Sequence, residues 1–107
     1  YAAMKLCAAH GLSLKDVPLK PPHHVPADTP FVKTLLHSYE KFTGVTGAKP
    51  LAIGGGTYVH DIKNGVAFGA VLPGIDTHMH GADEFFDLEN IVLATKVYAE
   101  AIIELCS

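Results

Sequence analysis

Residues 50–57 read PLAIGGGT, a pattern that predicts a short buried strand running directly into a glycine turn. A second apolar run of strand length, VAFGAVL, occupies residues 66–72 after a turn signal at Asn64 and Gly65. Nearly continuous apolar strands are typical of sheets that helices cover on both faces. The two runs therefore predict a layered α/β fold rather than an antiparallel sandwich.

Helical patterns lie on both sides of these runs. Residues 2–10 are strong helix formers. The residues DTP at 28–30 predict a second helix start, and Gly44 ends the apolar spacing that follows. A third amphipathic helix is expected from about residue 88 to 105, with Asp87 as its N-cap.

A proline-rich connector at residues 21–26, PPHHVP, divides the chain. It cannot be helical, because proline lacks an N–H donor and restricts the residue before it. Residues 12–19 are expected to be extended, and they complete a helix-and-strand unit ahead of the connector. The sequence therefore predicts a domain boundary near residue 21.

Composition argues against several classes of protein. The 107 residues are 49% hydrophobic, which is enough to bury the core of one domain, and the charged fraction of 18% is low, which argues against intrinsic disorder. A formal charge of -3 and the absence of arginine argue against a nucleic-acid partner. The apolar runs are far shorter than the roughly 20 residues that span a bilayer. Cys7 and Cys106 lie near opposite ends, which favours a reduced, cytoplasmic protein, with one disulfide as the alternative.

Two groups of residues could carry chemistry. The glycine turn could present backbone N–H groups to an anion, although its spacing matches neither a Walker loop nor a dinucleotide fingerprint. The alternative is a tight turn that needs positive φ values. Among seven histidines, His78 and His80 share a loop with several carboxylates, whereas His23 and His24 are expected to be ordinary connector residues. Histidine is a common zinc ligand, but a zinc site needs about three protein ligands, so a solvated loop is the alternative.

Five blocks of sequence occur in one order: PHHVPADTP at 22–30, IGGGTY at 53–58, GVAFGA at 65–70, HGADEF at 80–85 and YAEAI at 98–102. Together they resemble the C-terminal portion of PepV-type, carnosinase-like dipeptidases. These enzymes belong to the cocatalytic zinc peptidases, which include aminoacylase and carboxypeptidase G. The resemblance implies that residues 1–20 are the last helix and strand of an α+β lid domain. It implies that residues 21–107 are the C-terminal part of an α/β catalytic domain.

The resemblance also implies roles for particular residues. His80, followed by Asp83 and Glu84, matches a His-x-x-Asn/Asp-Glu pattern whose histidine ligates one of two zinc ions. The family's glycine segment helps to hold the terminal carboxylate of the substrate, and the matching residues are Gly55, Gly56 and Thr57.

Two residues depart from the family pattern. Close relatives often have arginine near the position of His60, and more often asparagine at the position of Asp83. Either change could alter substrate preference or metal affinity.

The expected function is zinc-dependent hydrolysis of dipeptides by metal-activated water in the full-length protein. The chain alone is expected to be inactive, with no catalytic residue of its own, because the other metal ligands and the general base lie elsewhere in the family. Expected partners are a dipeptide, the remainder of the catalytic domain and a second copy paired through an exposed sheet edge. Two alternatives stay open: a non-catalytic histidine-rich metal-binding or oligomerising module, and an anion-binding α/β domain that uses the glycine turn.

Overall fold

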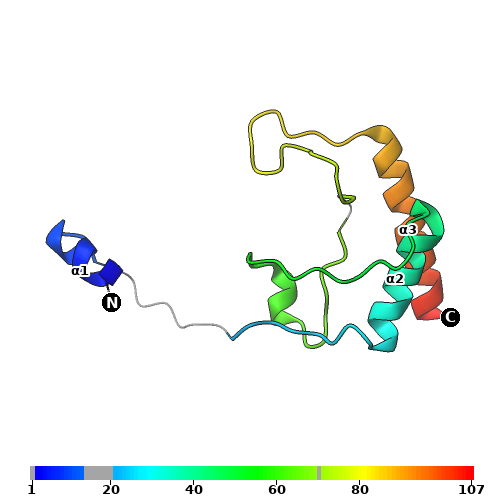
Figure 1. The fold of residues 1–107 in the computed structure, drawn as a ribbon, viewed down its shortest axis with the longest axis horizontal. Helices are drawn as coiled ribbons and strands as arrows, with labels where there is room; N and C mark the ends of the chain where they lie inside the picture. Colours follow the sequence, from blue (N-terminus) through cyan, green and yellow to red (C-terminus); the bar gives the residue numbers. More distant parts are fainter. Residues whose placement is uncertain (1, 14–20, 70) are drawn as a thin grey trace.

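The computed structural model describes residues 2–13, 21–69 and 71–107, and this part of the chain contains helices and loops but no β-strand. The elements follow in the order α1 (Ala2–Ala9), α2 (Pro30–Thr43), the 3-10 helix η1 (Tyr58–Asp61) and α3 (Leu88–Cys106) (Figure 1). The predicted α/β fold is therefore wrong for the described residues. None of their helices combines the length and the hydropathy that a membrane crossing requires.

In the described residues, the two apolar runs that predicted strands are irregular instead. Residues 50–53 have no regular structure, and the side chains of Leu51 and Ile53 are 81% and 71% exposed. Residues 66–69 also lack a hydrogen-bonded partner strand among the described residues. A strand exists only where a neighbouring strand pairs with its N–H and C=O groups, and apolar residues alone do not provide that ladder. Consequently, the described residues do not form the sheet edge that was expected to pair with a second copy.

Helix α2 begins and ends where its local signals predict. The Thr29 hydroxyl accepts a hydrogen bond from the Val32 N–H at 3.3 Å, and proline occupies the first turn. Gly44 adopts a left-handed conformation with φ of 73°, and its N–H donates to the Glu40 carbonyl at 3.0 Å. The predicted start and stop of this helix are confirmed.

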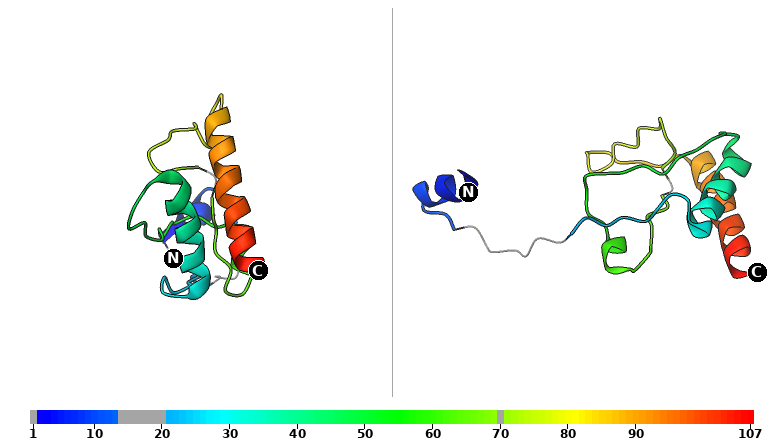
Figure 2. Two further views of the ribbon diagram at one scale, coloured as in Figure 1. Left: turned by 90° about the vertical axis from the view of Figure 1, so that its right-hand side faces the viewer. Right: turned by 60° about the horizontal axis from the view of Figure 1, so that its bottom comes forward.

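Helices α2 and α3 pack against each other in antiparallel directions (Figure 2). Asp87 is the N-cap residue of α3, as predicted, although its side chain does not cap the helix. An ion pair joins Lys41 of α2 to Glu100 of α3. The buried hydrophobic core of the described residues consists of Val32, Leu35, Ala94, Val97 and Ala101.

Many other large apolar side chains of the described residues stay exposed. On α3 alone, Leu88 is 79% exposed, and Ile102 and Ile103 are 62% and 63% exposed. Exposed apolar side chains that recur along one helix form a surface that another part of a protein can cover. The α2–α3 pair therefore buries only one face of α3.

Helix α1 lies apart from α2 and α3 and packs against no other described element (Figure 1). Helix α1 confirms the helix predicted over residues 2–10. Gly11, the predicted stop, follows it with a left-handed φ of 68°. The expected strand at 12–19 falls largely on residues 14–20, which lie outside the described part of the chain. Residues 21–26 have no helix, as predicted for the connector.

Candidate functional site

His80 lies on an exposed loop between the irregular segment after residue 66 and helix α3. Its backbone N–H donates to a carboxylate oxygen of Glu84 at 3.4 Å. The side chain of Glu84 thus folds back toward the histidine that precedes it by four positions. His80 and Glu84, which the family pattern pairs in sequence, are also neighbours in space.

The base of this loop is closed by hydrogen bonds. Thr77 is buried, and its carbonyl accepts a hydrogen bond from the Phe85 N–H at 3.1 Å. The N–H of His78 donates to a carboxylate oxygen of Asp76 at 2.9 Å. The His78 ring meets the Phe85 ring edge-on, with centroids 5.4 Å apart. His78 therefore takes part in the internal structure of the loop.

Three residues of the loop other than glycine have a left-handed backbone. The φ values are 53° at His78, 65° at His80 and 56° at Asp83. This conformation costs an L-residue about 1 to 2 kcal/mol, although histidine and aspartate tolerate it better than most. Strained residues of this kind cluster at functional sites, so the loop is the leading candidate site of the described residues.

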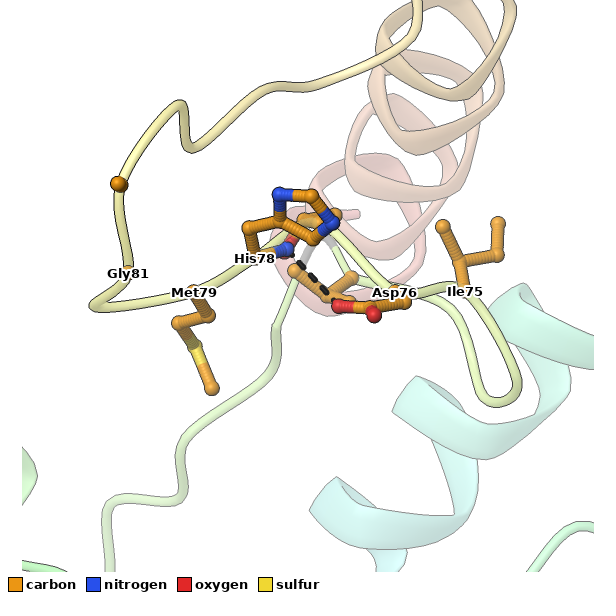
Figure 3. Close-up of a pocket in the computed structure, with 8 residues that line it drawn as sticks. Ile75, Asp76, His78, Met79 and Gly81 are labelled. Atoms are coloured by element: carbon orange, nitrogen blue, oxygen red, sulfur yellow. Dashed lines mark hydrogen bonds between the residues drawn. The ribbon is translucent and has the colours of Figure 1, made fainter.

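An open depression of about 540 Å³ lies beside this loop. Its wall includes the side chains of Val71, Ile75, Asp76, His78 and Met79. Figure 3 shows His78 above Asp76, with the hydrogen bond between them drawn as a dashed line. His80 is not part of this wall, so the depression and the predicted metal ligand are separate features of one loop.

The glycine turn is exposed along its whole length, including Gly55, Gly56 and Thr57. None of the three glycines at 54–56 has a positive φ, so the alternative of a tight turn that requires positive φ is wrong. A Cβ atom built on any of them would meet no atom within 4 Å. Neither local conformation nor packing within the described residues therefore requires glycine here. Glycine also permits a close approach of the backbone to a ligand, and that use is consistent with this exposure.

The glycine turn and the loop of His80 project in the same general direction, away from the α2–α3 pair (Figures 1 and 2). No hydrogen bond or ion pair recorded for the described residues joins the two. The described residues also contain no group of three His, Cys, Asp or Glu side chains that could hold a metal ion. The chain thus presents two of the expected site components on one side without assembling a complete metal site.

Two residues to which the sequence assigned no role in the site hold irregular segments in place through hydrogen bonds. Tyr98 of α3 donates its hydroxyl to the Phe68 carbonyl at 3.1 Å, and burial raises the pKa of this tyrosine above its ordinary value. His23, expected to be an ordinary connector residue, places Nε2 2.6 Å from the Gly65 carbonyl oxygen. Each interaction joins residues at least 30 positions apart, so no local pattern could have revealed it.

Comparisons with known proteins support the resemblance noted in the sequence. Residues 10–104 match the model of peptidase family M20/M25/M40. The Beta-Ala-Xaa dipeptidase of Lactobacillus delbrueckii subsp. lactis is 49% identical over 84 residues, which are 78% of this chain and 18% of that protein. The provisionally named dipeptidase YtjP of Bacillus subtilis (strain 168) is 46% identical over 86 residues, which are 78% and 18% of the two chains.

These relatives are much longer than the chain. The chain spans about a fifth of the length of the curated relatives that it matches. No solved structure matches the chain significantly. The predicted resemblance to the dipeptidases is confirmed, and it extends over most of the 107 residues.

Proposed function

The chain belongs to peptidase family M20/M25/M40, and on this premise we propose that it is the carboxyl-proximal part of a longer zinc-dependent dipeptidase. In this proposal, residues 1–20 belong to a lid domain and residues 21–107 to the catalytic domain. The remainder of the catalytic domain would cover the apolar side chains of α3 that are exposed in this chain. The free thiols of Cys7 and Cys106 favour a cytoplasmic location for the enzyme.

The observation that carries the proposal is the exposed position of His80 on a loop whose backbone is held in place. A metal ligand must present a ring nitrogen to the ion in a defined orientation, and partners around the ligand fix that orientation. Here the loop closure at Thr77 and Phe85 and the carboxylate of Glu84 restrain the backbone that carries the imidazole. These features fit a histidine that serves as one ligand of a larger site.

Imidazole is a suitable ligand for zinc, which takes three or four protein ligands. His80 would supply one of them, and the other ligands and the general base would come from the rest of the polypeptide. When bound, a pair of zinc ions supplies Lewis-acid activation of the water that attacks the peptide carbonyl. The reaction adds one water across the peptide bond and releases a carboxylate and an amine.

The glycine turn would hold the terminal carboxylate of the dipeptide. Backbone N–H groups of Gly55 and Gly56 and the hydroxyl of Thr57 are donors of the kind that bind a carboxylate. The exposed backbone and the open space around each glycine support this role. A side chain at position 55 or 56 would occupy the space through which the carboxylate approaches.

The proposal is tested by comparing His80→Ala with His78→Ala in the full-length enzyme. His78 is the matched control, because it is an imidazole on the same loop whose ring contacts Phe85, while its backbone N–H donates to Asp76. We expect His80→Ala to abolish dipeptide hydrolysis, because a metal site with one ligand removed no longer holds both ions in position. We expect His78→Ala to keep most of the activity. Equal activity of His80→Ala and the unaltered enzyme would refute the proposed role.

The two alternatives give different outcomes in the same experiments. A histidine-rich metal-binding module predicts zinc binding that survives His80→Ala, because several histidines would share the ion. An anion-binding domain predicts that a nucleotide raises the melting temperature, whereas the dipeptidase hypothesis predicts no such shift. No contact within the described residues favours either alternative over the dipeptidase.

A further inference from the structure

One side chain of the connector reaches the loop that follows the glycine turn. His23 Nε2 lies 2.6 Å from the carbonyl oxygen of Gly65, although the two residues are 42 positions apart. A carbonyl oxygen can only accept, so Nε2 carries the proton and donates it to this hydrogen bond. The His23 side chain is half-buried, which makes the bond harder for water to replace.

The same imidazole also contacts the 3-10 helix η1. The rings of His23 and His60 have centroids 5.4 Å apart and are tilted by 46°. His60 belongs to η1, and its own N–H donates to the Thr57 carbonyl at 3.1 Å. Thr57 is the last residue of the glycine turn. A continuous set of contacts therefore leads from the connector to the proposed carboxylate site.

The acceptor of the His23 hydrogen bond has little room to move. A Cβ atom on Gly65 would lie 2.9 Å from Cγ2 of both Val59 and Ile62. These two side chains are β-branched and therefore stiff at χ1. The Gly65 N–H also donates to the Ile62 carbonyl at 3.1 Å. The loop at 57–65 is thus a compact unit, and His23 holds it from the connector side.

We propose that His23 is a positioning residue that sets the orientation of the glycine turn and thereby the affinity of the enzyme for its dipeptide. This inference rests on the proposed function of the glycine turn. His23 does not touch the substrate in this scheme, because it acts through the Gly65 carbonyl and the His60 ring. The connector joins the two proposed domains. His23 therefore ties the position of the connector to that of the substrate-binding turn.

The test compares four variants of the full-length enzyme: His23→Ala, His23→Gln, Gly65→Ala and His24→Ala. Glutamine keeps an N–H donor at about the position of the histidine Nε2, and exposed His24 is the matched control beside it. We expect His23→Ala to raise KM about three- to tenfold, the effect of one lost hydrogen bond, while kcat and zinc content stay unchanged. We expect His23→Gln to restore KM, Gly65→Ala to raise it and His24→Ala to leave it unchanged.

Amide hydrogen exchange provides a readout that does not depend on activity. His23→Ala should speed exchange of the amides at residues 57–65, and His23→Gln should reverse that change. An unchanged KM in His23→Ala, or a KM that glutamine fails to restore, would overturn the inference while leaving the dipeptidase proposal intact. An enzyme that hydrolyses no dipeptide would instead overturn the proposed function, and with it the substrate part of this inference.

Discussion

Replacing Tyr98 by phenylalanine removes one hydroxyl group that holds an irregular segment against α3. The Tyr98 hydroxyl donates to the Phe68 carbonyl at 3.1 Å. The two rings also meet edge-to-face, with centroids 5.7 Å apart and an interplanar angle of 74°. Tyr98→Phe keeps the ring contact and loses only the hydrogen bond, whereas Tyr98→Ala loses both. The pair of variants therefore separates the two interactions.

The expected magnitudes follow from these contacts. One net hydrogen bond contributes about 1 kcal/mol, and an edge-to-face aromatic pair contributes about 1 kcal/mol more. Tyr98→Phe should thus lower the free energy of unfolding by about 1 kcal/mol and Tyr98→Ala by at least about 2 kcal/mol. With a urea slope of about 1 kcal/mol per molar, the midpoints should fall by about 1 M and 2 M. Urea unfolding of the chain at pH 7, followed by ellipticity at 222 nm, measures both shifts.

The same tyrosine predicts a pH dependence. Burial raises the pKa of Tyr98 in the folded chain, so the unfolded chain ionises at this position first as the pH rises. The contribution of Tyr98 to stability is therefore complete below about pH 10 and is lost as the pH rises through the raised pKa. The stability difference between the unaltered chain and Tyr98→Phe should narrow at pH 11. A Tyr98→Phe chain as stable as the unaltered one at pH 7, or a difference that does not narrow, would refute this reasoning.

Further predictions concern the core, the cap and the isolated chain. Leu35→Ala should lower the free energy of unfolding by about 2 to 5 kcal/mol, because only 7% of this side chain is exposed. The control Leu51→Ala, at a position 81% exposed, should change it by less than about 0.5 kcal/mol in the same urea titration. Thr29→Ala should lower the free energy of unfolding by about 1 kcal/mol, because it removes the N-cap of α2, whereas Thr29→Ser should keep the cap. Thermal unfolding measures the difference, and equal melting temperatures for the two variants would contradict the capping role. The 107-residue chain should hydrolyse no dipeptide in the presence of zinc, and zinc-dependent hydrolysis by the purified chain would contradict the fragment hypothesis.

The helices could be predicted from the sequence because their signals are local. The residues Thr29 and Pro30 start α2, and Gly44 ends it within a few positions of the last apolar residue. The prediction of two strands was wrong, because a strand depends on a partner that the local sequence does not specify. Residues 50–53 and 66–69 have the apolar character of strands, but they find no partner strand among the described residues.

For the candidate site, the loop could be predicted from the sequence, but its contacts and its backbone conformation could not. The sequence predicted a loop that holds His78 and His80, and the structure adds the contact between the His80 backbone N–H and Glu84. The sequence did not reveal the left-handed backbone at His78, His80 and Asp83, because no glycine marks these positions. It also missed His23, whose partner lies 42 residues away. Tertiary contacts of this kind leave no pattern in a single sequence.

The zinc content of the full-length protein shows whether His80 is a metal ligand. Metal analysis of the purified unaltered enzyme, of His78→Ala and of His80→Ala would count the ions bound to each polypeptide. We expect two zinc ions in the unaltered protein and in His78→Ala, and a clear loss of bound zinc in His80→Ala. Two tightly bound zinc ions in His80→Ala would contradict the assignment of this imidazole as a metal ligand.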